Sequence, residues 1–191
     1  MAVPTPTIAV ILAAGGSTRF ADGPKQLARF AGRPMVEIAA RAALDAGCFD
    51  RVVVVSGSVD LGDVLPDGVV ELSNPSWADG QATSVQAGIA HARSLGVSRV
   101  VIGLADQPMV GAEDWRLVAE SPSEAPIVVA VHDGRRGNPV RLDESVWEDL
   151  PREGDEGARA LMRGRPSLVG EVACPGDSHD VDTVEDLDRW N

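Results

Sequence analysis

Residues 7–25 read TIAVILAAGGSTRFADGPK, and this stretch decides the fold. It begins with an unbroken apolar run, TIAVILA (7–13), which is typical of a β-strand buried on both faces. Two glycines follow at 15 and 16, and then a loop that contains Arg19 and ends in Lys25. Lys25 is the only lysine in the chain, whose lysines and arginines number 17. The pattern predicts a strand that ends in a glycine-rich loop carrying two cations.

Similar apolar runs recur along the chain, separated by segments with a helical pattern. Further strands, rich in Val and Ile, are predicted at 51–57, 68–73, 98–105 and 125–132. Helices are predicted at 34–47, 80–96, 112–121, 143–150 and 155–163, with a closing helix over 182–190. HDGRRGNPVRL (132–142) predicts a hairpin or a strand that leaves and re-enters the sheet. This alternation predicts an α/β fold class with a three-layer, Rossmann-like arrangement around a mainly parallel sheet.

Size and composition narrow the class of protein. The 191 residues are 44% apolar and only 4% aromatic, which favours one domain over 1–191 with an aliphatic core. The net charge of −12 argues against a nucleic-acid partner, because binding to phosphate backbones needs a basic face. The run IAVILAA (8–14) is too short for a signal or membrane segment. Cys48 and Cys174 are expected to be reduced, buried thiols, so we expect a cytoplasmic protein away from the membrane.

The glycine-rich loop is a candidate phosphate site. Glycine lets the backbone approach a ligand, and successive N–H groups can form an anion-binding nest. The loop lacks the G-K-[ST] ending of a Walker A motif and the spacing of G-x-G-x-x-G. A plain turn would also explain the glycines. Arg19 and Lys25 favour the phosphate site, because two cations on one loop suit a triphosphate.

Several motifs, in order along the chain, resemble those of one enzyme family. LAAGGSTRF (12–20) with Lys25 resembles the signature L-A-A-G-x-S-x-R-M-G-x-x-K of nucleotidyltransferases. The other matching segments are NPSWADGQATSVQAG (74–88), LADQP (104–108), GNPV (137–140), GDEGAR (154–159) and DVDTVEDL (180–187). Over nearly its whole length, the chain is similar to molybdenum cofactor cytidylyltransferases and their guanylyl-transferring relatives. It departs from the signature at Phe20-Ala21, where Met-Gly is usual, and by one extra residue between Arg19 and Lys25.

The resemblance implies a nucleotidyltransferase fold and the transfer of a nucleotidyl group to a phosphorylated acceptor with release of pyrophosphate. Such a reaction needs aligned reactants and neutralised charge rather than a protein nucleophile. The implied catalytic residues are Arg19, Lys25 and Asp106. The implied nucleotide-binding residues are Leu12, Ala13, Ala14, Gly15, Gly16, Ser17, Gly80 and Ser84. CTP is the expected nucleotide, because LAAG resembles the cytidylyl branch whereas the guanylyl relatives, which use GTP, more often carry L-A-G-G.

Two acidic segments are candidates for a metal site. Asp106 follows the predicted strand 98–105, at the sheet edge where α/β enzymes bind ligands, and its carboxylate can hold Mg²⁺. Asp182 would share the metal if the fold brings it beside Asp106, with Asp180 as the competitor for that role. Mg²⁺ is the expected cofactor on these grounds. The alternative is that these carboxylates bind no metal and only cap the following turn and the last helix.

The resemblance also implies that nucleotide binding belongs to about residues 1–110 and acceptor binding to about 111–191. The implied acceptor-binding residues are Gln107, Asn138, Pro139, Asp155 and Arg159. Asp155 and Arg159 also have the i, i+4 spacing of a helical surface pair, which would contribute only about 0.2–0.5 kcal/mol. The implied acceptor is the phosphate of a molybdopterin-type cofactor, and a molybdoenzyme that receives the product is the implied partner.

Other functions stay open at this point. They are guanylyl transfer to the same cofactor, transfer to another small phosphorylated acceptor, and a non-catalytic carrier or insertion factor. Lys25, Asp106 and Asp182 are all present, which favours an enzyme, because a carrier has no need of charges that stabilise a transition state. Trp77 could shelter a ligand or simply be buried, and Trp115, Trp147 and Trp190 are expected to pack in the interior.

Overall fold

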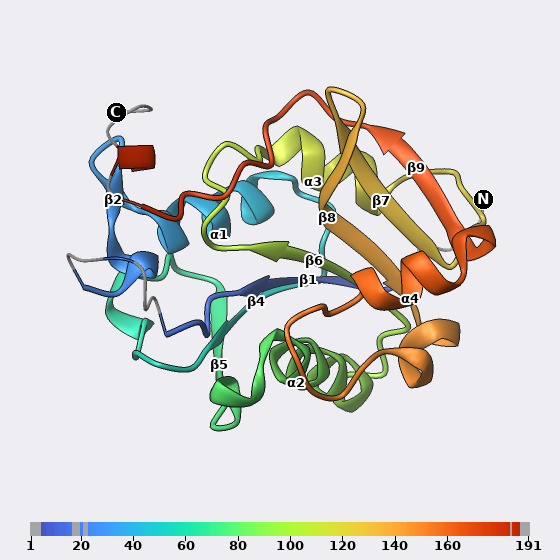
Figure 1. The fold of residues 1–191 in the computed structure, drawn as a ribbon, viewed down its shortest axis with the longest axis horizontal. Coiled ribbons are helices and arrows are strands. Elements are labelled where there is room, and N and C mark those ends of the chain that lie inside the picture. The colour runs from blue at the N-terminus through green and yellow to red at the C-terminus, as the bar shows by residue number, and fades with distance from the viewer. Residues whose placement is uncertain (1–4, 17–19, 21–22, 184, 188–191) are drawn as a thin grey trace.

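A seven-stranded sheet forms the middle layer of the protein, as the computed structural model shows (Figure 1). The structure describes residues 5–16, 20, 23–183 and 185–187. The strand order is β5-β4-β1-β6-β8-β7-β9. All neighbours pair in parallel except β8, which is antiparallel to both β6 and β7. The strands are β1 (Thr7–Leu12), β4 (Arg51–Ser56), β5 (Val69–Ser73), β6 (Arg99–Leu104), β7 (Ile127–His132), β8 (Arg135–Asp143) and β9 (Val169–Ala173).

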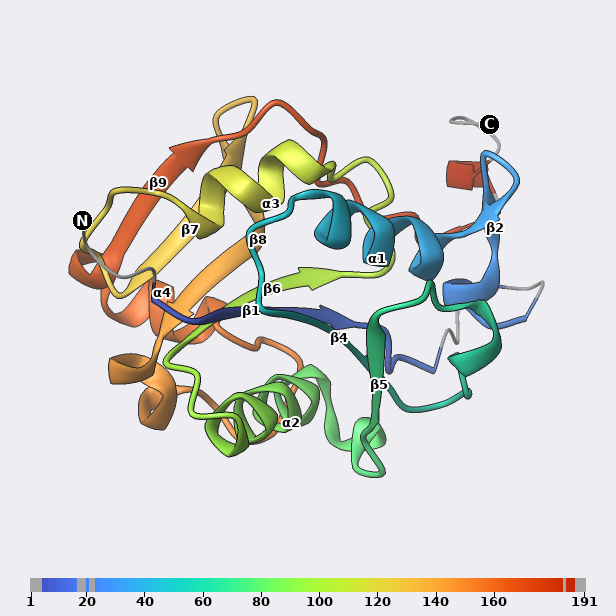
Figure 2. The same ribbon diagram turned by 180° about the vertical axis from the view of Figure 1, so that it is seen from behind.

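Helices cover both faces of the sheet. In Figures 1 and 2, α1 (Met35–Asp45) and α3 (Ala112–Ala119) lie above it, and α2 (Gln81–Ser94) lies below. The side chains of β1 alternate between the two layers, as the period of a strand requires. Ile8 and Val10 pack in the core that contains α2 and α4 (Arg159–Gly164), whereas Ala9 and Ile11 pack against α1 and α3. Because β1 is buried on both faces, the expected three-layer α/β fold with a mainly parallel sheet is confirmed.

The helix predictions fail in two places, for identifiable reasons. The predicted helix 143–150 is a 3-10 helix, η4 (Glu144–Asp149), that ends before Pro151. The predicted helix 155–163 begins only at Arg159, because Gly157 adopts a φ of 48° that an α-helix does not allow. The closing helix is described only over 185–187, since the rest of its predicted span lies partly outside the described residues.

The hairpin alternative for residues 132–142 is confirmed, since β7 and β8 pair in antiparallel fashion. Strand β9 and a small ribbon of β2 (Arg29–Phe30) and β3 (Arg33–Pro34) were not predicted. The remaining 3-10 helices are η1 (Lys25–Leu27), η2 (Gly62–Val64), η3 (Trp77–Asp79) and η5 (Pro166–Leu168). After β9 the chain turns back over the sheet, and the short helical segment at 185–187 lies beside β2 (Figure 1). Phe20, Met35, Val181 and Leu187 form a small apolar cluster that joins the N-terminal and C-terminal parts of the chain.

Both cysteines are free thiols; Cys174 is buried as expected, whereas Cys48 is only half-buried. Burial raises the pKa of each to about 11. They are therefore protonated at neutral pH, and neither is a thiolate nucleophile. Trp115 and Trp147 are 1% exposed, which confirms their packing role, while Trp190 lies outside the described residues. In the part of the chain that the structure describes, no helix is both long and apolar enough to span a bilayer.

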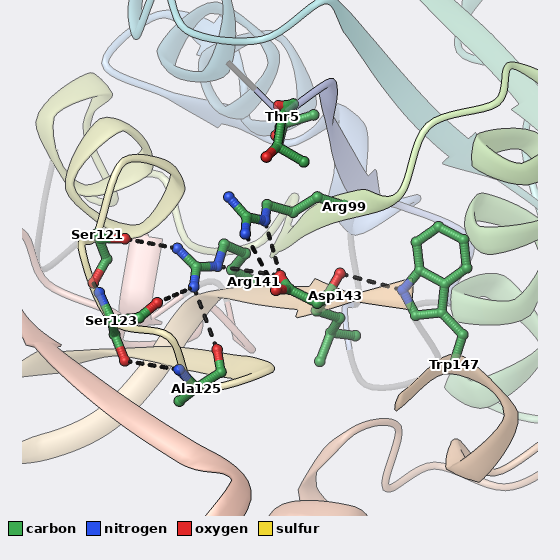
Figure 3. Close-up of polar contacts among 10 residues, drawn as sticks. Thr5, Arg99, Ser121, Ser123, Ala125, Arg141, Asp143 and Trp147 are labelled. Carbon is green, nitrogen blue, oxygen red and sulfur yellow. Dashed lines mark hydrogen bonds and ion pairs between the residues drawn. The ribbon is translucent and has the colours of Figure 1, made fainter. Parts of the chain in front are cut away.

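A buried arginine fixes the loop between α3 and β7 (Figure 3). The guanidinium of Arg141, on β8, donates hydrogen bonds to the backbone carbonyls of Ser121, Ser123 and Ala125 at 2.9, 2.7 and 3.3 Å. Its Nε lies 3.4 Å from the carboxylate of Asp143, which also receives two hydrogen bonds from Arg99. Burial and the nearby Arg99 lower the pKa of Arg141, and Asp143 opposes that shift.

Candidate active site

The carboxyl ends of β1 and β6 create the site. The two strands are adjacent and parallel, and the N–H of Ala105 donates to the carbonyl of Leu12 at 3.1 Å. The glycine-rich loop after β1 and Asp106 after β6 therefore leave the sheet side by side. They border a cavity of about 360 Å³. Its lining includes predicted nucleotide-binding residues, namely Leu12, Ala13, Ala14, Gly15, Gly16, Gly80 and Ser84, together with Lys25, Asp106, Asp155, Asp182 and Trp77.

Lys25 joins two carboxylates that are far apart in the sequence. Its Nζ lies 2.6 Å from Oδ2 of Asp106 and 2.7 Å from Oδ1 of Asp182. Burial alone would lower the pKa of Lys25, but the two carboxylates outweigh it and raise the pKa above its ordinary value. The lysine is therefore an ammonium ion at neutral pH, held between the two predicted metal ligands.

A chain of hydrogen bonds holds the segment that carries Asp182. The backbone N–H of Val181 donates to the carbonyl of Asp106 at 2.9 Å. The side-chain amide of Gln107 donates to the carbonyl of Ser178 and to the carboxylate of Asp180, both at 2.8 Å. Burial, and then the charges of Asp106 and Asp182, raise the pKa of Asp180. Asp180 is thus bonded to Gln107, whereas Asp182 reaches Lys25.

Sequence reasoning missed Gln26, which shapes the loop from inside. Its side chain is 5% exposed, and its amide donates to the carbonyls of Ala13 and Gly15 at 2.9 and 2.5 Å. These bonds fix the direction of the loop backbone at the cavity wall. A glutamine beside a lysine gives no signal of this role in the sequence.

A second cavity, of about 270 Å³, adjoins the first and shares Leu12, Gln81 and Leu104 with it. Its floor consists of core side chains from the sheet and α4, such as Ile102, Val140 and Met162. Polar side chains complete the lining: Arg136, Asn138, Glu156, Arg159 and Arg163. Two predicted acceptor-binding residues, Asn138 and Arg159, therefore line one cavity next to the predicted nucleotide site. Gln107 and Pro139 line neither of the two cavities.

Comparison with known proteins identifies the family. Residues 9–171 match the MobA-like NTP transferase domain. The chain belongs to this family. The match covers the loop after β1, Asp106, the whole second cavity and the first cavity apart from Asp182, so the expectation of a nucleotidyltransferase enzyme is confirmed. Asp182 lies beyond the matched range.

Proteins similar to this MobA-like chain carry different names. Nicotine blue oxidoreductase of Paenarthrobacter nicotinovorans is 32% identical over 200 residues, which cover 94% of each protein. The crystal structure of Rv0371c from Mycobacterium tuberculosis H37Rv is 28% identical with a TM-score of 0.83, covering 99% of this chain and 98% of that one. A structure of Rv0371C in complex with manganese is 27% identical with a TM-score of 0.79, covering 97% and 98%.

In this MobA-like chain, Asp106 and Asp182 are carboxylates, which are side chains of the kind that hold divalent cations, and both line the first cavity. Their oxygens converge on one cationic atom, Nζ of Lys25. Among the described residues, no group of three or more His, Cys, Asp or Glu side chains is arranged to bind a metal. Two carboxylates suffice for Mg²⁺ when substrate phosphates and water complete its shell. The donor set therefore fits a cation that is shared with a nucleotide. Ser17 and Arg19 lie outside the described residues.

Asp155 lines the first cavity and does not form the helical surface pair with Arg159 that its spacing suggested. It precedes α4, so the helical pair with Arg159 is wrong. Its Oδ1 instead lies 3.4 Å from the backbone N–H of Gln81, the first residue of α2. The neighbouring Gly154 donates to the carbonyl of Asp79 and accepts from the N–H of Ala82. The segment at 154–155 therefore closes over the start of α2.

Ser84, a predicted nucleotide-binding residue, lies in the lining of the first cavity. Its hydroxyl, which belongs to a side chain that is 3% exposed, accepts a hydrogen bond from the amide of Asn74.

Gly80→Ala is expected to lower the stability of the protein. Gly80 has a φ of 107°, and a Cβ there would lie 2.5 Å from the backbone of Gly154. Strain and displacement of Gly154 should lower the free energy of unfolding by about 1–3 kcal/mol, as measured by urea denaturation. Gly164→Ala is the matched control, because nothing lies within 4 Å of its added Cβ. An equal, small effect of both substitutions would contradict the expected close approach.

Proposed function

We propose that this chain transfers a cytidylyl group from CTP to the phosphate of a molybdopterin-type cofactor and releases pyrophosphate. The observation that carries the proposal is the contact of Lys25 with both Asp106 and Asp182 in the lining of the first cavity. Together these residues offer one mobile cation and two metal-binding carboxylates beside a backbone loop suited to phosphate. Membership of the MobA-like family supports the reaction class. The LAAG sequence at 12–15 supports CTP rather than GTP.

The reaction forms a bond between an acceptor phosphate oxygen and the α-phosphorus of CTP, and it breaks the bond to the β-phosphate. In this proposal the backbone at 13–15 contacts the base, with Leu12, Gly16, Ser17, Gly80 and Ser84 around the nucleotide. Lys25 and Arg19 neutralise the phosphate charge, which builds on the leaving pyrophosphate. Asp106 and Asp182 would hold Mg²⁺, which would supply neutralisation of the phosphate charge. The structure of the similar Rv0371C in complex with manganese supports the use of a divalent cation.

We assign the acceptor to the second cavity, next to the nucleotide. Asn138 and Arg159 in its lining offer an amide and a cation to the acceptor, and Asp155 lines the adjoining first cavity. Gln107 supports Asn138, since the Asn138 amide donates to Gln107 at 3.2 Å. We also assign Pro139, the residue after Asn138, to the acceptor site. In this assignment residues 1–191 form one domain, with a nucleotide-binding part at about 1–110 and an acceptor-binding part at about 111–191. The protein is then cytoplasmic and passes its product to a molybdoenzyme.

A panel of nucleotides and acceptors tests the proposal. Purified protein with Mg²⁺ is incubated with CTP, GTP, ATP or UTP, with and without the molybdopterin cofactor, and pyrophosphate release is measured. Release from CTP that depends on the cofactor is expected, at a rate roughly tenfold or more above that from GTP. Release from GTP alone would reverse the base assignment. Release only with another phosphorylated acceptor would replace the molybdopterin, and nucleotide binding without any release would favour the carrier.

The similarity to nicotine blue oxidoreductase, at 32% identity over 94% of both chains, favours a second candidate activity on nicotine blue. An oxidoreductase would need an electron donor or acceptor but no nucleoside triphosphate. Absorbance of nicotine blue, followed with NADH or NADPH, distinguishes the two activities. The proposed function would be replaced by this one if two results were obtained together. The absorbance of the dye would have to change with NADH or NADPH and without CTP, and the same protein would have to release no pyrophosphate.

A further inference from the structure

The atom that lies between the predicted metal ligands is a cation of the protein itself. Nζ of Lys25 is within 2.7 Å of an oxygen of both Asp106 and Asp182. The lysine side chain is 17% exposed, and those of Asp106 and Asp182 are 23% and 35% exposed. The three groups thus form a partly buried ion cluster in which the ammonium has the place expected for a metal.

Lys25 and a metal ion cannot share these oxygens without strong repulsion. Mg²⁺, for example, binds its oxygen ligands at a metal–oxygen distance of about 2.0–2.1 Å. An ammonium group bonded to the same oxygens would crowd that coordination shell. Two cations this close, partly withdrawn from water, repel each other more than they would in bulk solvent. Metal binding therefore requires Lys25 to leave the carboxylates.

A nucleotide offers Lys25 another partner. Lysine carries a compact charge on a flexible four-carbon stem, so its ammonium can move while the backbone stays in place. The lining of the first cavity contains Lys25 together with residues 13–16 of the glycine-rich loop after β1. Triphosphate bound along that loop would attract the ammonium, and the two carboxylates would then be released to bind the cation that accompanies the nucleotide.

We propose that Lys25 is an internal counter-cation that occupies the metal site of the free protein and yields it only when nucleotide phosphates bind. This inference rests on the proposed function, since it assigns Asp106 and Asp182 to the metal. It implies that the free protein binds metal weakly and that nucleotide and metal bind as a coupled pair. Because such coupling is reciprocal, the metal strengthens nucleotide binding by the same factor.

Removal of the lysine charge tests the inference with Mn²⁺ alone as the probe. Free Mn²⁺ is measured by electron paramagnetic resonance during titration of the wild-type protein and Lys25→Met, without nucleotide. Lys25→Met is expected to bind Mn²⁺ about tenfold more tightly than wild type, or more. Lys25→Arg keeps the charge and should bind as weakly as wild type. The double variant Lys25→Met/Asp106→Asn should lose the gain, which would assign the ion to these carboxylates.

The opposite outcome is equally clear. Mn²⁺ binding by Lys25→Met that is no tighter than that of wild type overturns the inference. If Lys25→Met does not fold, Lys25→Gln repeats the test with a neutral, polar side chain. Failure of the proposed function is seen separately: a protein that releases no pyrophosphate from any nucleotide can still show the gain in Mn²⁺ affinity, and an active enzyme can lack it.

Discussion

Asp106→Asn is expected to lower the rate of nucleotidyl transfer at least about a hundredfold, equivalent to a loss of about 3 kcal/mol of transition-state stabilisation. The substitution keeps the shape of the side chain but removes its charge. It removes the partner that lies 2.6 Å from Lys25 and one of the two proposed metal ligands. The measurement is pyrophosphate release under saturating CTP, acceptor and Mg²⁺, after circular dichroism has shown that the fold is retained.

Asp106 and Lys25 are expected to act as a unit. Lys25→Met alone should also reduce the rate at least about a hundredfold, because the phosphates lose the ammonium group, whose attraction to them is stronger in the transition state. The double variant Lys25→Met/Asp106→Asn should be only slightly slower than the slower single variant, since residues that act together give non-additive losses. Rate losses that multiply in the double variant would show that the two side chains act independently.

Asp67→Asn is the matched control for Asp106→Asn. Asp67 is an exposed aspartate in the turn before β5, at the amino edge of the parallel strands and so opposite the site. Its substitution should leave the rate within about twofold, as for surface changes worth less than about 0.5 kcal/mol. Full activity of Asp106→Asn would remove this residue from the metal site and from the mechanism.

Part of this site could be predicted from the sequence because it depends on strand direction. The apolar runs at 7–13 and 98–105 are nearly continuous, so they identify strands buried on both faces. Residues that follow parallel strands meet at one sheet edge, which is why the loop before Lys25 lies next to Asp106. The approach of Asp182 was conditional on the fold, and the structure supplies the path: the chain returns after β9 across the sheet (Figure 1).

The features that the sequence did not predict depend on tertiary contacts that leave no pattern in the sequence. Strand β9 reads VGEVA, and its glycine and glutamate interrupt the apolar run that identifies a buried strand. It forms at the sheet edge because β7 offers it a parallel partner, with Ile127 opposite Val169. Gln26 and Arg141 are polar residues whose burial follows only from the backbone carbonyls that surround them in the folded chain.

Arg141→Met is expected to lower the free energy of unfolding by about 3–5 kcal/mol, the cost of breaking a buried charged network by removal of one partner. Arg141 is 1% exposed, and its guanidinium is the hydrogen-bond donor to three backbone carbonyls of the loop before β7 (Figure 3). Methionine fills similar volume but donates nothing. The carbonyls of Ser121, Ser123 and Ala125 would lose these bonds, and buried acceptors without partners are costly.

Two variants separate the hydrogen bonds from the charge and from general damage to β8. Arg141→Lys keeps the charge but has no planar fork that reaches several carbonyls at once, so an intermediate loss of about 1–3 kcal/mol is expected. Arg136→Met changes an arginine on the same strand that pairs with Glu171 at the surface, and it should cost less than about 1 kcal/mol. Urea denaturation gives all three values. If Arg141→Met costs no more than Arg136→Met, the loop before β7 does not depend on the guanidinium for its position.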